Sequence, residues 1–418
     1  MFDTASPLQK SRREEAVTAT IHAHRNAFPQ REPGESGTGW IDALCPDFSA
    51  HSFLRRSSET CPLLGRMGWA LDRVAASALS VPYRKKIQPH LSDTTLQEYI
   101  DYHAFYSQSR FLDDPGSAFE RPRWWRQSVI ERATRRRSWD PKNAKLASID
   151  FYSPFQTLDP RFRDEYAALE PNDRVESRAW FHRDGPRPVV IFLHGFSAPD
   201  YRINKMWFSA ERYFDAGLDV VFMNLPLHGG RLPHSAAFHG AAIIQPSLWR
   251  LSEACAQGVM DLRILLDYLL KRGAPNVGIM GYSWGGFHAS LMACLEPRTD
   301  FIVSVAPVVS IADLVMSWPT RSFFEESLDE PAVMIRELRK ILAPFTPLSH
   351  PISIPKERVL LAASGNDGLI PAVHTEVLWE HFGRPEVYWS CGGHILYFDK
   401  ERVTDRALEF LRNIEVIP

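Results

Sequence analysis

The last two-thirds of the chain alternates short apolar runs with longer segments in which apolar residues recur at helical spacing. Residues 188–195 hold five consecutive large apolar residues before a histidine and a glycine, a run typical of parallel strands buried on both faces. Further strands are expected at residues 148–155, 174–182, 218–225, 276–282, 301–309, 359–367 and 387–391, and helices at about 205–216, 248–272 and 403–414. This alternation predicts an α/β fold with a doubly wound, mostly parallel sheet and helices on both faces.

Residues 1–145 have a different pattern, in which polar residues interrupt the short apolar runs. Two segments, 63–81 and 95–111, have the spacing of Leu, Met, Tyr and Phe that indicates helices. We therefore expect a mainly helical N-terminal extension or cap at residues 1–145 and the main α/β domain at residues 146–418. An insertion with helical pieces and several prolines, at about residues 313–356, is expected to add to the cap.

One stretch of the N-terminal region, residues 121–139, carries seven arginines and three tryptophans. It admits two interpretations. The functional one is a patch that binds a membrane surface or an anionic substrate. The structural one is a solvated helix whose arginine stems and tryptophan rings pack on the neighbouring domain. We favour the second, because the charge of the whole chain is balanced.

The balance of charge and the distribution of apolar residues exclude several classes of protein. A formal net charge of −2 gives no field that attracts nucleic acid. No run of eighteen apolar residues indicates a membrane span, and the N-terminus lacks the apolar core of a signal peptide. The five cysteines are scattered and odd in number, so they predict neither a disulfide framework nor a metal pair. A reducing cytoplasm is the expected location.

The most informative stretch is residues 276–292, in which an apolar strand breaks at Gly281-Tyr282-Ser283-Trp284-Gly285 and continues as a helix of small residues. G-x-S-x-G at a strand-to-helix turn is the nucleophile elbow of serine hydrolases. The two glycines allow the strand and the helix to approach each other, because neither residue has a Cβ atom. The turn lifts the Ser283 hydroxyl clear of the sheet, and the helix N-terminus favours a developing negative charge.

Three other strand ends carry reactive or glycine-rich residues: His194-Gly195, Asp367 and His394. Serine needs an adjacent base at neutral pH, and His394, which follows Gly392 and Gly393, lies in a loop flexible enough to reach it. A carboxylate must hold the histidine in one tautomer, and Asp367 follows the strand expected at residues 359–367. The sequence therefore predicts Ser283 as nucleophile, His394 as base and Asp367 as acid.

Other residues compete for these roles. Asp367 is also a plausible cap of the following helix, and Asp313 is the best substitute acid. His374 and His381 are weaker bases, because they fall on an expected helix. A local group, His228, His234 and His239, has spacings that match no usual zinc pattern, so we expect no metal and no cofactor.

The order nucleophile, acid and base along the chain, together with four motifs, resembles the α/β-hydrolase superfamily. The motifs are His194-Gly195-Phe196, the elbow at residues 281–285, the segment 365–371 and Gly392-Gly393-His394, and the resemblance covers about the last two-thirds of the chain. It implies an oxyanion hole formed by the backbone N–H groups of Phe196 and Trp284. The chain lacks an H-G-G-G loop, which argues against the hormone-sensitive-lipase-like esterases. The N-terminal region resembles the helical extension of some bacterial members.

These observations predict a serine hydrolase that cleaves an acyl bond of a small-molecule substrate, with a carboxylic ester favoured. A carbon–carbon bond hydrolase or a peptidase with the same triad is the first alternative, followed by a membrane-surface lipid hydrolase and a non-catalytic binding protein. Homo-oligomerisation stays open. The candidates for the substrate pocket are His194, Tyr282, His228 and Arg231, of which His194 is expected mainly to order its loop. His228 and Arg231 are expected to brace a loop beside the pocket, where Arg231 could also meet an acidic substrate group.

Overall fold

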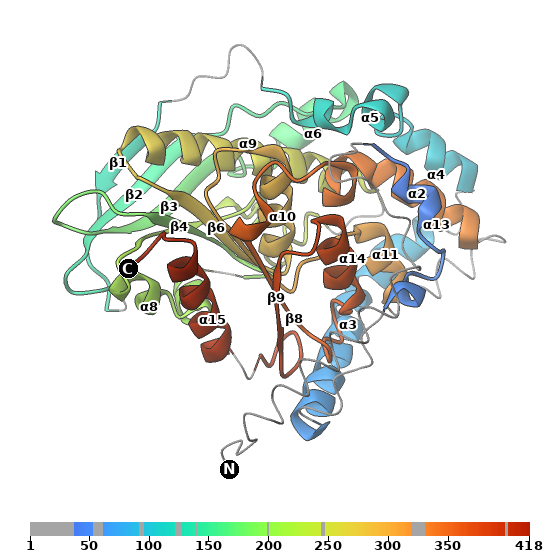
Figure 1. The fold of residues 1–418 in the computed structure, drawn as a ribbon. Coiled ribbons are helices and arrows are strands. Elements are labelled where there is room, and N and C mark those ends of the chain that lie inside the picture. Colours follow the sequence, from blue (N-terminus) through green and yellow to red (C-terminus); the bar gives the residue numbers. More distant parts are fainter. Residues whose placement is uncertain are drawn as a thin grey trace.

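A computed structural model of the chain describes residues 37–52, 62–91, 96–121, 128–138, 140–198, 200–243, 247–318, 331–397 and 400–418. Its centre is a nine-stranded sheet with helices on both faces (Figure 1). The strands, in their order across the sheet, are β1 (Ile130–Ala133), β2 (Lys145–Tyr152), β3 (Arg174–Phe181), β5 (Asp219–Met223), β4 (Val189–Leu193), β6 (Val277–Tyr282), β7 (Ile302–Val305), β8 (Val359–Ser364) and β9 (Glu386–Ser390). The first three pairings, from β1 to β5, are antiparallel and all the others are parallel.

Both faces of the parallel part of the sheet are apolar, as its strand sequences require. In β4, Val189, Ile191 and Leu193 belong to one hydrophobic cluster, whereas Val190 and Phe192 belong to the other. Since successive side chains of a strand point to opposite faces, a strand between two layers of helices must be apolar at every position. The uninterrupted run of five apolar residues is therefore the expected sequence of a central strand.

Two sets of helices cover the sheet and contribute to these clusters. One layer holds α9 (Trp249–Lys271), α10 (Trp284–Leu295) and α14 (Val373–His381), and α13 (Pro331–Leu342) of the insertion contributes to the same cluster. The other layer holds α7 (Tyr201–Phe208), α8 (Ala210–Asp215) and α15 (Lys400–Asn413). This arrangement confirms the predicted doubly wound α/β fold.

Three parts of the structure differ from the expected elements. The single helix expected at residues 205–216 is two helices, α7 and α8, because Ser209 between them has a left-handed backbone with a φ of 50°. The helix expected at residues 121–139 is wrong for the described part of that stretch, which contains strand β1. Residues 122–127 and 139 lie outside the described residues. The sheet thus begins at Ile130, before the boundary expected near residue 145.

Before β1, the N-terminal region contains the helices α2 (Trp40–Ala43), α3 (Pro62–Leu91), α4 (Leu96–His103) and α5 (Ser109–Asp113). The insertion expected at residues 313–356 begins in α11 (Ile311–Ser317) and continues in α13, while residues 319–330 lie outside the described residues. No described helix combines the length and the apolar content that crossing a membrane requires.

The structure corrects the prediction made from the cysteines. Cys391 is disulfide-bonded, whereas Cys45, Cys255 and Cys294 are free, and Cys61 lies outside the described residues. The scattered, odd set of cysteines predicts no disulfide framework and does not reveal this bond, because spacing along the chain does not report which residues the fold brings together. The cysteine pattern therefore no longer argues for a reducing compartment.

Candidate active site

Ser283 occupies the turn between β6 and α10 with φ 55° and ψ −110°, a conformation that non-glycine residues rarely adopt. The glycines on either side are required by close backbone contacts. A Cβ atom at Gly281 would lie 2.0 Å from the carbonyl oxygen of Gly285, and one at Gly285 would lie 2.0 Å from that of Leu193. The strained serine and its two obligatory glycines form the elbow expected from the sequence.

His394 and Asp367 meet beyond the ends of β9 and β8. The His394 Nδ1 atom lies 2.6 Å from Asp367 Oδ2, and both side chains are buried. The other carboxylate oxygen, Asp367 Oδ1, accepts the backbone N–H groups of Leu369 at 2.9 Å and Ile370 at 2.7 Å. Asp367 therefore closes the turn that follows it and also binds the histidine, whereas the following helix, α14, begins after Ala372 and has no side-chain cap.

The substitute acid, Asp313, lies in α11 and is paired elsewhere. Both of its oxygens contact the Arg339 guanidinium, at 2.6 and 3.1 Å, and the Ser310 hydroxyl donates to it at 2.5 Å. The Asp313 carboxylate is therefore paired with Arg339 and not with a histidine. Asp367 is thus the acid that the structure brings to His394.

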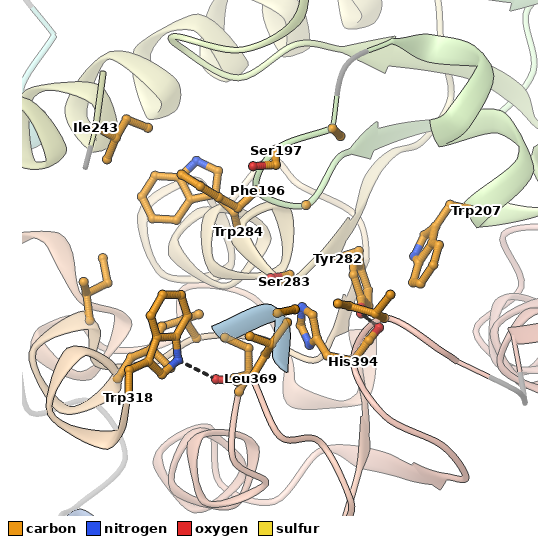
Figure 2. Close-up of a pocket in the computed structure, with 18 of the residues that line it drawn as sticks. Phe196, Ser197, Trp207, Ile243, Tyr282, Ser283, Trp284, Trp318, Leu369 and His394 are labelled. Carbon is orange, nitrogen blue, oxygen red and sulfur yellow. Dashed lines mark hydrogen bonds between the residues drawn. The ribbon is translucent and has the colours of Figure 1, made fainter. Parts of the chain in front are cut away.

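Ser283 and His394 line the same cavity (Figure 2), although no hydrogen bond joins the serine hydroxyl to the imidazole in this structure. Such contacts often tighten only when substrate binds. Tyr282 links the two residues, because it precedes the serine and its hydroxyl donates to the His394 carbonyl oxygen. The two rings lie 4.8 Å apart between centroids, and burial raises the pKa of Tyr282 well above its usual value, so its hydroxyl stays protonated. Tyr282 is therefore in contact with the candidate base.

The loop after β4 is fixed by His194. Its Nδ1 atom donates to the Gly195 carbonyl oxygen at 2.8 Å, while its Nε2 atom accepts the Leu225 N–H at 3.0 Å. Burial lowers the pKa of His194 to about 4, which keeps the ring neutral as these two bonds require. A Cβ atom at Gly195 would lie 3.6 Å from Ser283 Cβ, so this loop runs directly beside the elbow.

The other pocket candidates support loops and are not among the lining residues. Arg231 is buried and donates to Asp261 at 2.8 Å and to the carbonyl oxygen of Asn172 at 2.8 Å, so its charge is already paired. His228 is buried, its Nδ1 donates to the Pro226 carbonyl oxygen at 2.8 Å, and burial lowers its pKa. These residues hold the segment after β5 in place behind the cavity.

The other histidines considered from the sequence, His374, His381 and His239, bond backbone groups elsewhere in the structure. His374 and His381 are on α14, as expected, where His374 accepts the Val309 N–H and His381 contacts the carbonyl oxygens of Pro347 and His350. His239 accepts the Gly229 N–H at 3.1 Å. No group of three metal-binding side chains occurs within the ranges that the structure describes.

A cavity of about 600 Å³ opens at Ser283 and His394, a volume in the range of sites for drug-sized molecules. Apart from the tryptophan indoles, the polar side chains of the described lining are Ser197, Asn204, Tyr282, Ser283 and His394, and this lining contains no lysine, arginine, aspartate or glutamate. The large apolar lining residues are Phe196, Ile203, Trp207, Phe208, Ile243, Leu248, Leu251, Trp284, Val308, Ile311, Leu314, Val315, Trp318, Leu369, Ile370 and Ile395. The cavity is suited to a neutral, apolar group.

Two walls of the cavity come from outside the main sheet and its loops. Helix α3 contributes Ala75 and Ala78, which the sequence did not indicate. Trp318, at the end of α11, donates its indole N–H to the Leu369 carbonyl oxygen at 2.9 Å, which ties the insertion to the loop of Asp367 (Figure 2).

Residues 190–406 match the model of the alpha/beta hydrolase family. Because this match spans just over half of the 418 residues and the sheet has the corresponding architecture, the chain belongs to the alpha/beta hydrolase family. Membership of this family supports hydrolase activity for the chain.

Two further similarities extend beyond the matched region. The chain is 27% identical over 343 residues to the uncharacterized protein Rv2627c of Mycobacterium tuberculosis (strain ATCC 25618 / H37Rv), a similarity that covers 79% of each protein. Among solved structures, it resembles acetyl xylan esterase 1 from Thermoanaerobacterium sp. JW/SL YS485, with a TM-score of 0.51 and 17% identity, over 77% of this chain and 99% of the other. At that identity the second likeness concerns the fold alone.

Proposed function

We propose that this protein hydrolyses carboxylic esters that carry an apolar acyl group, with Ser283 as nucleophile, His394 as base and Asp367 as acid. The observation that carries the proposal is the apolar, uncharged cavity that opens at the elbow serine and at a histidine bound to a buried carboxylate. Uncharged walls disfavour substrates with charged groups near the scissile bond, because such groups would lose water without gaining a partner.

The reaction would proceed through an acyl-enzyme. The Ser283 oxygen forms a bond to the carbonyl carbon while His394 takes the hydroxyl proton, and the carbonyl oxygen becomes an oxyanion. The ester C–O bond then breaks, and the alcohol leaves with the proton from His394. Water attacks the acyl group, again losing a proton to His394, and the carboxylic acid is released as Ser283 regains its proton.

The oxyanion would accept hydrogen bonds from the backbone N–H groups of Phe196 and Trp284. Trp284 is the first residue of α10, and the first N–H groups of a helix have no acceptor within it. Phe196 lies in the loop that passes beside the elbow, and both residues line the cavity. Such a donor contributes about 3–4 kcal/mol to transition-state stabilisation.

The N-terminal region and the insertion would together act as the cap over this site. The cavity lining supports this assignment, since Ala75 and Ala78 of α3 and Leu314 and Val315 of α11 face the same cavity as Ser283. Substrate selectivity would then depend on side chains that lie outside the core of the α/β domain.

A series of p-nitrophenyl esters tests the proposal. If the acyl chain lies in the apolar cavity, each added methylene is stabilised by about 0.8 kcal/mol, and kcat/KM rises about fourfold per carbon until the cavity is full. The Ser283→Ala variant should have no activity on any ester of the series. A kcat/KM that is highest for acetate and falls with chain length, or turnover only of an amide or a diketone, would contradict the proposed substrate.

A further inference from the structure

Helix α3, from the N-terminal region, lies directly against the two loops that carry the acid and the base (Figure 1). A Cβ atom at Gly68 would lie 2.3 Å from the backbone nitrogen of Gly393, and one at Gly65 would lie 2.3 Å from the Asn366 side chain. At Gly68 the neighbour is backbone, so the helix approaches this loop at a distance that only glycine permits, whereas at Gly65 the neighbour is a side chain. Gly65 and Gly68 lie three residues apart, so they share one face of α3.

The same face of α3 carries Asp72, a fully buried carboxylate. Its Oδ2 atom accepts the backbone N–H groups of Gly368 at 2.9 Å and His394 at 2.5 Å, and its Oδ1 atom accepts that of Ile395 at 2.9 Å. Gly368 follows the acid directly, and Ile395 follows the base. One carboxylate thus binds both loops immediately beside the Asp367–His394 pair.

This side chain is costly to bury. Burial is the largest cause of the raised pKa of Asp72, and the nearby Asp367 carboxylate raises it further, whereas the three backbone N–H groups lower it. Buried carboxylates usually pair with a cation, yet the hydrogen-bond partners found for Asp72 in the described residues are all backbone amides. The three backbone hydrogen bonds offset this cost only while the two loops hold their N–H groups in position against the carboxylate.

We propose that Asp72 is a positioning residue for hydrolysis, which holds the loop of Asp367 and the loop of His394 at the spacing their hydrogen bond needs. The inference rests on the proposed function, because it assigns a catalytic purpose to that pair. With Asp72 in place, His394 is fixed at three points: its N–H by Asp72, its carbonyl oxygen by Tyr282 and its ring by Asp367. Helix α3 is therefore part of the active site.

The test compares Asp72→Asn and Asp72→Ala with a matched control. The asparagine keeps one acceptor oxygen but turns an NH₂ group towards an N–H donor, and the alanine removes all three bonds. Glu253→Gln is the control, because Glu253 is also a buried carboxylate that accepts three hydrogen bonds, from Tyr106 and from the backbone of Leu158 and Asp159. It lies in α9 and contacts neither loop.

Three readouts separate positioning from general stability. A misplaced catalytic group costs on the order of 100-fold, so we expect kcat on a p-nitrophenyl ester to fall about 10- to 100-fold in Asp72→Asn and further in Asp72→Ala. KM should change little, because Asp72 is not among the cavity-lining residues described. The rate of fluorophosphonate labelling of Ser283 should fall in proportion to kcat, while Glu253→Gln keeps the wild-type values of all three.

A readout that does not need turnover is the low-field proton resonance of the His394 ring N–H that faces Asp367, assigned by its absence in His394→Gln. We expect it to shift or broaden in both Asp72 variants and to be unchanged in Glu253→Gln. If the Asp72 variants do not fold, Gly68→Ala takes their place, because it retains the carboxylate but pushes α3 away from Gly393. We expect it to lower kcat and to shift the resonance as predicted for Asp72→Asn.

Two kinds of failure can be told apart. Wild-type protein that neither turns over esters nor labels at Ser283 would overturn the proposed function, and the proton resonance would still report whether Asp72 holds the pair. Wild-type kcat and an unshifted resonance in the Asp72 variants would overturn the positioning role. Equal losses in the Asp72 and Glu253 variants would also overturn it, because they would indicate an effect of stability alone.

Discussion

Replacing Asp367 by asparagine is a sharp perturbation, because the structure fixes how the new side chain must lie. In the wild type, Oδ1 accepts the N–H groups of Leu369 and Ile370 while Oδ2 faces His394 Nδ1. An asparagine that keeps its oxygen on the two amides must turn its NH₂ group towards the histidine. The ring nitrogen Nδ1 then becomes an acceptor, and the proton moves to Nε2.

This change of tautomer determines the size of the effect. A histidine that is protonated on Nε2 cannot take the proton of Ser283, so the base is present but in the wrong form. In serine hydrolases the corresponding change lowers kcat by about 10⁴-fold, or about 5 kcal/mol in activation free energy. Folding should be nearly unaffected, because the asparagine oxygen still accepts both backbone amides.

The assay is the kcat of p-nitrophenyl ester hydrolysis, with fluorophosphonate titration to count competent sites. Asp313→Asn is the matched control, since Asp313 is the other acid that the sequence offered and is paired with Arg339. Leaving that buried arginine without its carboxylate should cost about 3–5 kcal/mol of stability, yet kcat per folded site should stay near the wild type. If Asp367→Asn retained more than a tenth of wild-type kcat, or if Asp313→Asn were the slower enzyme, the assignment of the acid would be refuted.

Two further predictions concern the cavity and the response to pH. Ala75→Phe adds a ring to the α3 wall of the cavity and should exclude about two methylenes of the acyl chain, at about 0.8 kcal/mol each. The kcat/KM for long-chain esters should therefore fall about 15-fold relative to that for short-chain esters. An unchanged ratio in the ester series would show that the acyl group lies elsewhere. Burial lowers the pKa to about 4 from the usual 6.5 in His103, His194, His288 and His350. Between pH 6.5 and 4 the unfolded chain therefore binds protons at these histidines that the folded chain does not bind. The free energy of unfolding keeps their whole contribution above pH 6.5 and decreases as the pH falls towards 4, by about 2 kcal/mol per histidine at pH 5. Urea unfolding at pH 7.5 and pH 5 measures this loss, and equal free energies of unfolding at the two pH values would contradict it.

The elbow and the contact between Asp367 and His394 were predictable because their signals are local. A glycine two residues on either side of Ser283 reports the close approach of strand and helix without any knowledge of the rest of the fold. Asp367 and His394 each follow a recognisable strand, and the carboxyl ends of parallel strands lie at one edge of the sheet. The contact between them follows from that topology alone.

Asp72 could not be found in the same way, because α3 reverses the usual rule of burial. Among its described side chains, at residues 63–78, the large apolar ones are exposed, with Leu63 at 71% and Val74 at 66%, while Gly68 and Asp72 face the protein. A search for an apolar helix face therefore selects the wrong side. The signal that was present is the G-x-x-G pair of Gly65 and Gly68, which marks a close approach but does not name the partner.

Strand β1 was missed for a related reason. A four-residue edge strand, such as Ile130–Ala133, pairs through its backbone and needs few apolar side chains. Its Glu131 accepts hydrogen bonds from Tyr268 of α9 and from Arg272, which follows α9, so this charge is used in contacts within the chain. Charge content alone did not distinguish this strand from a solvated helix.

The most direct test of the account is covalent labelling of the intact protein with a fluorophosphonate, followed by mass spectrometry of the protein and of its peptides. We expect one adduct per chain, located on Ser283, and no adduct in Ser283→Ala or after prior denaturation. Labelling at another residue, or a folded wild-type protein that takes up no label, would contradict the claim that Ser283 is an activated nucleophile.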